Sequence, residues 1–79
     1  MKITSTPING VYIIEPEPVH DSRGFFARTF CTDELGKAGL VTQFPQCNIS
    51  YNSKRATLRG MHYQIAPFGE TKIVRCTTG

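Results

Sequence analysis

The feature that most constrains this chain is its apolar residues, which come in short bursts separated by proline, glycine and small polar residues. GVYIIEP (residues 10–16) contains the first burst, and FFARTF (residues 25–30) is another. Bursts of this length, rich in β-branched and aromatic residues and bounded by turn residues, are typical of β-strands. The prolines of EPEP (residues 15–18) exclude a central strand there, because proline lacks a backbone donor. HDSRG (residues 20–24) is typical of a turn.

The rest of the chain continues this pattern around one helical candidate, TDELGKAGL (residues 32–40). Thr32 can cap this helix, the acidic residues that follow suit the dipole of its first turn, and its two glycines keep it short. Extended structure is expected over residues 41–52, with strands over 57–65 and 71–79. The sequence therefore predicts a mostly β protein, a sandwich or barrel, with one short helix.

The length of 79 residues allows one small domain with a thin stability margin. Five or six strands are too few to close a typical two-sheet sandwich, and open strand edges invite pairing. We therefore expect residues 1–79 to form a single domain that is the N-terminal portion of a larger fold, or that completes itself by oligomerising. A homodimer that exchanges N-terminal strands is the expected assembly.

Composition and charge argue against several classes of function. No apolar run approaches the ~18 residues of a membrane span, and the N-terminus lacks the features of a signal peptide. The default is a cytoplasmic protein without a membrane partner. The net charge of +3 is mild and its basic residues are scattered, so a small anionic ligand is favoured over nucleic acid. The three cysteines form no C-x-x-C pair, which indicates neither a disulfide framework nor a zinc site.

The stretch TLRGMHYQIAPFGETKIVR (residues 57–75) places titratable groups within a segment expected to form strands. His62 is compatible with a half-buried histidine that bonds a neighbour, and equally with a general base, since imidazole titrates near neutral pH. Lys72 is compatible with a solvated strand edge. If it faces His62 instead, the two suit removal of a proton next to a carbonyl, where the cation stabilises the enolate oxygen.

A metal site at the same place is not favoured. His62 followed by Glu70 is similar to part of a cupin metal pattern, but Gln64 stands where a second histidine would be needed. The other histidine, His20, lies in the expected turn far upstream. One histidine and one carboxylate do not make an ordinary metal cage, so we predict no metal.

One glycine separates Arg23 from two aromatic residues, Phe25 and Phe26. An arginine fork beside aromatic rings could hold a phosphate while a ring stacks on a base or sugar. Most arginines are solvated surface groups, so this pattern alone leaves both interpretations open.

Taken together, these segments resemble the N-terminal part of the dTDP-4-dehydrorhamnose 3,5-epimerase family. The similar segments follow one another in the family's order and spacing, and they are GVYIIEP, DSRGFFARTF, FPQCNISYN, TLRGMHYQ and ETKIVRC. The resemblance implies a cupin-type jelly roll that acts as a homodimer without metal or organic cofactor. It implies epimerisation at C3 and C5 of a nucleotide-linked 4-keto-6-deoxyhexose, in deoxysugar (rhamnose-type) and cell-surface polysaccharide biosynthesis.

The resemblance also implies roles for individual residues. His62 corresponds to the general base, and Lys72 to the lysine that holds the enolate oxygen. The resemblance implies four substrate-binding residues. Arg23 corresponds to an arginine that contacts the nucleotide part, and Arg59 to one that contacts phosphate. Gln46 and Asn48 correspond to residues that meet the nucleotide. The family's acidic partner of the base and its reprotonating tyrosine belong to a second half that lies outside these 79 residues.

This sequence departs from the family pattern at two further positions. Cys47 replaces an aspartate between Gln46 and Asn48, and Arg28 replaces a glutamate that helps recognise thymine. Two other functions stay open beside the epimerase. One is a non-catalytic cupin module that binds a nucleotide sugar or another anion, and the other is a purely structural role. Little or no activity is expected of residues 1–79 by themselves.

Overall fold

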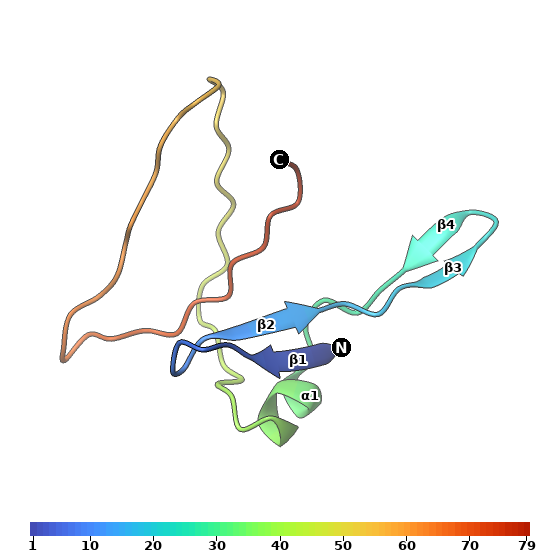
Figure 1. The fold of residues 1–79 in the computed structure, drawn as a ribbon, viewed down its shortest axis with the longest axis horizontal. Helices are drawn as coiled ribbons and strands as arrows, with labels where there is room; N and C mark the ends of the chain where they lie inside the picture. Colours follow the sequence, from blue (N-terminus) through green and yellow to red (C-terminus); the bar gives the residue numbers. More distant parts are fainter. The chain divides into compact units, whose positions relative to one another are not determined.

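The computed structural model describes residues 1–79, which form two compact units, Met1–Pro45 and Gln46–Gly79. All regular elements lie in the first unit (Figure 1). In chain order they are β1 (Lys2–Ser5), β2 (Tyr12–Glu15), β3 (Val19–Asp21), β4 (Gly24–Phe26) and α1 (Thr32–Lys37). The predicted strands at 10–16 and 25–30 and the predicted helix at 32–40 are confirmed in shortened form.

β1 and β2 form an antiparallel two-stranded sheet in which Ile3 lies opposite Ile14. Both isoleucines are half-buried, whereas Lys2 and Glu15 are exposed at the end of the same ladder and pair at 3.8 Å. This alternation follows from the two-residue period of a strand. The sequence analysis did not predict β1, which contributes only one apolar residue to the sheet.

β3 and β4 form a second antiparallel sheet, a hairpin in which Asp21 lies opposite Gly24. Two residues, Ser22 and Arg23, make its loop. Gly24 has a φ of +133°, which a residue with a side chain rarely adopts. Sequence reasoning placed a turn over residues 20–24 and no strand before it, so β3 is an addition to the predicted fold.

α1 begins after Cys31, whose side chain makes no capping hydrogen bond, so the prediction that Thr32 caps the helix is wrong. Its first turn carries the expected acidic residues. At its end the amide of Leu40 donates to the carbonyl of Leu35, and that of Gly39 donates to the carbonyl of Gly36, both at 3.0 Å. These two bonds, with a φ of +73° at Gly39, make a Schellman motif. The helix is short because its own sequence terminates it.

The core of the first unit is centred on Leu35, which is 1% exposed and is the only residue of the chain classed as buried. The half-buried apolar residues all belong to the same unit, and besides Met1 they are Ile3, Ile14, Ala27, Cys31, Leu40 and Phe44. Phe44 also meets Phe30 edge to face, with ring centroids 6.0 Å apart. So small a core is in keeping with the thin margin expected of this length.

The second unit, Gln46–Gly79, contains no strand or helix, and all its residues are exposed. The strands predicted over 57–65 and 71–79 are therefore absent from the structure. Residues 41–52, expected to be extended, take part in no sheet either. A strand exists only where its backbone meets a neighbour, and the one backbone hydrogen bond in this unit joins Phe68 to Ile65. An alternating sequence alone does not supply that neighbour.

The fold class is confirmed at the level of short strands in two small antiparallel sheets with one short helix. The six-residue helix α1 is too short to cross a membrane, and the chain has no other helix.

Candidate functional site

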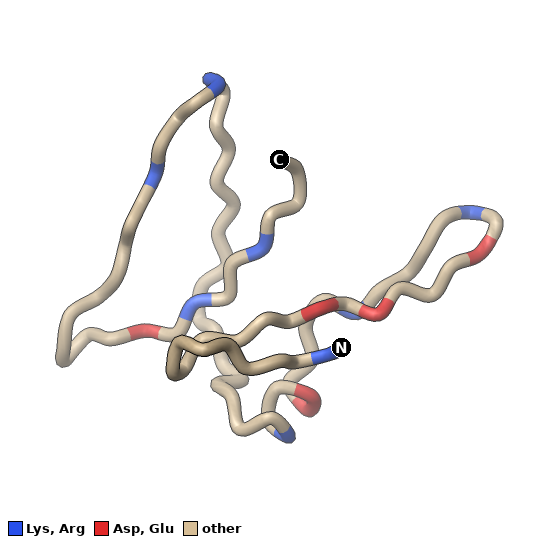
Figure 2. The backbone as a smooth tube through the Cα atoms, viewed as in Figure 1, with Lys and Arg blue, Asp and Glu red and all other residues tan.

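Arg23 stands at the tip of the β3–β4 hairpin, where Figure 2 shows an acidic and a basic position side by side. Its Nη2 and Nε both donate to Oδ2 of Asp21, at 2.6 and 3.2 Å, and its backbone amide donates to Oδ1 at 2.8 Å. Asp21 thus both closes the turn and orients the guanidinium of Arg23. Arg23 itself is 88% exposed, so its remaining donors face solvent.

This contact changes the chemistry of the carboxylate. Hydrogen bonds from the Arg23 side chain, and then from the backbone amides of Arg23 and Gly24, hold the pKa of Asp21 below its ordinary value. An anion that approaches Arg23 must therefore compete with a carboxylate that stays charged. Asp21 was predicted only as a turn former, although the D-x-R spacing was a signal for this pair.

Phe25 and Phe26 follow Arg23 on β4 and are 68% and 78% exposed. Together with Asp21 and Arg23 they line a shallow hollow on the hairpin. The ring of Phe25 also lies against His20, with centroids 5.7 Å apart. The hairpin therefore brings together an arginine fork and two open aromatic faces, the combination that suits a phosphate beside a ring.

Arg59 lies in the second unit and is held by the segment before it. Its Nη1 donates to Oγ of Ser50 at 2.6 Å, and its Nη2 donates to the carbonyl of Tyr51 at 3.0 Å. Both acceptors are uncharged, so the guanidinium keeps its full positive charge for an anion. Gln46 and Asn48 lie in the same unit, are exposed, and make no side-chain hydrogen bond. Cys47 between them is a free, exposed thiol.

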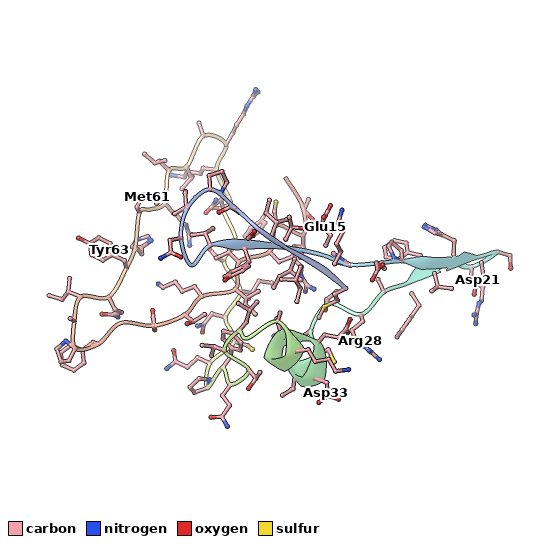
Figure 3. The ribbon with its side chains drawn as sticks, turned by 60° about the horizontal axis from the view of Figure 1, so that its bottom comes forward. Glu15, Asp21, Arg28, Asp33, Met61 and Tyr63 are labelled. Atoms are coloured by element: carbon pink, nitrogen blue, oxygen red, sulfur yellow. The ribbon has the colours of Figure 1, made fainter.

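His62 and Lys72, the predicted base and its cation, also lie in the second unit, and both are exposed. Lys72 pairs with Glu70 at 3.1 Å, whereas His62 makes no hydrogen bond or ion pair. No bond joins the two residues. The flanking residues Met61 and Tyr63 point away from the extended chain into solvent (Figure 3). The structure therefore does not assemble the predicted catalytic pair within residues 46–79.

Of the six predicted site residues, Arg23 lies in the first unit and the other five in the second. No group of three or more histidine, cysteine or acidic side chains lies close enough together to hold a metal ion. The chemistry that the described residues can offer is anion binding by two arginines, one beside aromatic rings.

The model of the dTDP-4-dehydrorhamnose 3,5-epimerase family matches residues 5–79 of this chain. The chain belongs to that family. The predicted family membership is thereby confirmed.

Curated members of the epimerase family are similar over the whole chain. The dTDP-4-dehydrorhamnose 3,5-epimerase of Shigella flexneri is 40% identical over 80 residues, which cover 100% of this chain and 44% of that protein. The protein of the same name from Escherichia coli K12 is 39% identical, with 43% of it covered. The dTDP-4-dehydrorhamnose 3-epimerase of Streptomyces niveus is 35% identical, with 38% covered.

The chain thus spans about two fifths of the length of the curated relatives that it matches. No solved structure matches it.

Proposed function

We propose that this chain is part of a nucleotide-sugar epimerase that inverts carbons next to the C4 ketone of a dTDP-linked 4-keto-6-deoxy sugar. The observation that carries the proposal is the family match over residues 5–79, which includes every predicted site residue. The names of the relatives supply the substrate class, because each is called an epimerase of dTDP-4-dehydrorhamnose.

In the proposed reaction the imidazole of His62 takes the proton from a carbon beside the ketone. The electrons of the broken C–H bond form a C=C bond, and the charge moves to the C4 oxygen, where the ammonium of Lys72 stabilises it. Return of a proton from the opposite face inverts the carbon. No electrons are gained or lost overall, so the reaction needs no oxidant or reductant.

The two arginines fit the anionic part of such a substrate. Arg23 presents a guanidinium beside Phe25 and Phe26, which suits a phosphate next to a base or sugar ring. Arg59 carries a charge that its uncharged partners, Ser50 and Tyr51, leave free to meet phosphate. We therefore propose both as substrate-binding residues, with Gln46 and Asn48 as further contacts to the nucleotide.

Jelly-roll geometry, a homodimer and a cytoplasmic location belong to the same proposal. In a cupin-type jelly roll, residues 57–65 and 71–79 would pair as strands and could bring His62 to Lys72. Sedimentation of the full natural chain at high concentration tests the dimer, and a clean monomer would contradict it.

Solvent exchange tests the catalytic assignment. In heavy water, the full natural chain should incorporate deuterium at C3, C5 or both carbons of a dTDP-linked 4-keto-6-deoxy sugar, as read by NMR. Removing a general base costs on the order of 10²–10⁴-fold, so His62→Ala should lose the exchange, and Lys72→Met should slow it strongly. Lys54→Met, a change of another exposed lysine of the second unit, is the matched control and should exchange normally. Unchanged exchange in His62→Ala would reject His62 as the base.

A non-catalytic binding module is the second candidate, and one observation favours it. Arg23 and its aromatic neighbours lie together on one hairpin, whereas no contact joins His62 to Lys72 in the second unit. Calorimetry, together with the exchange experiment, separates the two functions. Binding of the dTDP-sugar in calorimetry without any exchange of its C3 or C5 protons would support the module.

A further inference from the structure

The β3–β4 hairpin extends from the rest of the first unit as an arm (Figure 1). All six residues of its strands are exposed, and the two strands pack against each other and against no other element. Two connections join the arm to its unit, residues 16–18 before β3 and residues 27–31 after β4. Whatever fixes the direction of the arm must therefore act on these two connections.

A chain of four charged groups links both connections to α1. The ammonium of Met1 pairs with Glu17, in the first connection, at 2.9 Å and with Glu34, on α1, at 2.7 Å. The other oxygen of Glu34 accepts from Nη1 of Arg28, in the second connection, at 3.3 Å. Figure 3 shows Arg28 beside α1 and Asp21 at the far end of the arm. Glu34 thus pairs with Met1 through one carboxylate oxygen and with Arg28 through the other, so it joins the two connections.

The ionisation of these groups supports the pairing. Hydrogen bonds from the Met1 ammonium and from Arg28 lower the pKa of Glu34, and Glu34 and then Glu17 raise the pKa of the Met1 ammonium. The side chains of Met1 and Glu34 are 1% and 30% exposed, against 72% for Glu17 and 63% for Arg28, so the two middle residues of the chain of charges are less hydrated than the two at its ends. Ion pairs that form a network in partly buried positions count for more than isolated surface pairs.

We propose that Glu34, through Met1, Glu17 and Arg28, is a positioning residue that holds both ends of the arm and so places Arg23 for the phosphate of the substrate. The proposal rests on the proposed function in one respect, since it takes Arg23 to bind phosphate. It also assigns Arg28 a role of its own. The guanidinium that stands in the place of the family's thymine-recognising glutamate is directed to α1.

The test uses the full natural chain and dTDP as the probe, with affinity measured by calorimetry. Glu34→Gln removes two ion pairs without adding bulk, and we expect the Kd for dTDP to rise by about three- to tenfold. Asp33→Asn is the matched control, because it removes the neighbouring acid of the same helical turn, which makes no ion pair. Its Kd should change by less than about 1.5-fold. Arg28→Gln should repeat part of the Glu34→Gln effect and add little to it in the double variant.

Coupling to Arg23 separates positioning from a general loss of stability. In an Arg23→Ala background, Glu34→Gln should leave the already weakened Kd unchanged, because the residue that it positions is gone. An equal rise in both backgrounds, or no rise in either, overturns the proposal.

Amide hydrogen exchange of residues 19–26 is measured on the same variants without ligand. It should accelerate in Glu34→Gln and stay the same in Asp33→Asn, and unchanged exchange would overturn the claim that Glu34 holds the arm. If the unsubstituted chain does not bind dTDP, the proposed function fails by itself, while the exchange result still decides the positioning role.

Discussion

The two units of this chain differ in how far each pairs its own backbone and buries its own apolar side chains. In Met1–Pro45 every strand has a hydrogen-bonded partner, the helix is terminated by its own glycine, and Leu35 is buried. In Gln46–Gly79 large apolar side chains such as Ile49, Leu58 and Met61 are more than 90% exposed, and no sheet forms. Yet five of the six predicted site residues lie in this second unit. Local sequence thus forms the unit that carries one predicted site residue, Arg23, whereas the unit that carries the proposed base and cation needs contacts that its own residues do not make.

The largest expected effect contrasts one leucine from each unit in the chain of residues 1–79. Leu35→Ala should cost about 2–5 kcal/mol, because it opens a cavity at the only buried residue. Leu58→Ala should change the free energy of unfolding by less than about 0.5 kcal/mol, because Leu58 is 92% exposed. Urea unfolding followed by circular dichroism measures both. Equal losses would break the comparison, since they would show that Leu58 is buried in solution.

The same contrast explains what the sequence could predict of the fold. β2, β4 and α1 were predicted because their signals are local, namely β-branched and aromatic bursts and a helix bounded by glycine. β1 and β3 were missed because each is defined by its partner, as Ile3 is by Ile14 and Asp21 by Gly24. The strands expected over 57–65 and 71–79 failed for the converse reason, since a strand pattern without a neighbour stays unpaired.

The candidate site divides in the same way. The type and order of its residues were predictable from motifs, because motifs record chemistry along the chain. The pairing of Arg23 with Asp21 and of Arg28 with Glu34 was not predicted, since it depends on how a hairpin and a helix bring side chains together. Whether His62 meets Lys72 depends on sheet pairing, which remains a prediction.

A smaller effect tests whether α1 is held by its own sequence. Gly39→Ala should cost about 1 kcal/mol, because a φ of +73° is strained for a residue with a Cβ. Gly36→Ala, one turn earlier, should stabilise by about 0.5–1 kcal/mol, because alanine is the better helix former and its Cβ would meet Thr42 Cγ2 at an ordinary 3.6 Å. Urea unfolding of the 79-residue chain gives both signs. Two changes of the same sign would contradict the Schellman end of α1.

The smallest expected effect concerns acid and the tip of the arm. The folded pKa of Asp21 lies below its ordinary value of about 3.9, chiefly through the Arg23 side chain. The stabilisation from this pair is therefore fully present above the ordinary value, and it is lost as the pH falls through the lower, folded value. NMR titration of the Asp21 carboxyl carbon measures the shift directly.

In Arg23→Ala the midpoint of that titration should rise toward the ordinary value without quite reaching it, since the amides of residues 23 and 24 still donate. The effect on the exchange of the hairpin amides should be small, because both side chains are exposed and salt screens them. If the Asp21 midpoint stays where it was in Arg23→Ala, the guanidinium does not bind this carboxylate. The arm would then present Arg23 unrestrained, and the first unit would be no better ordered at its candidate residue than the second.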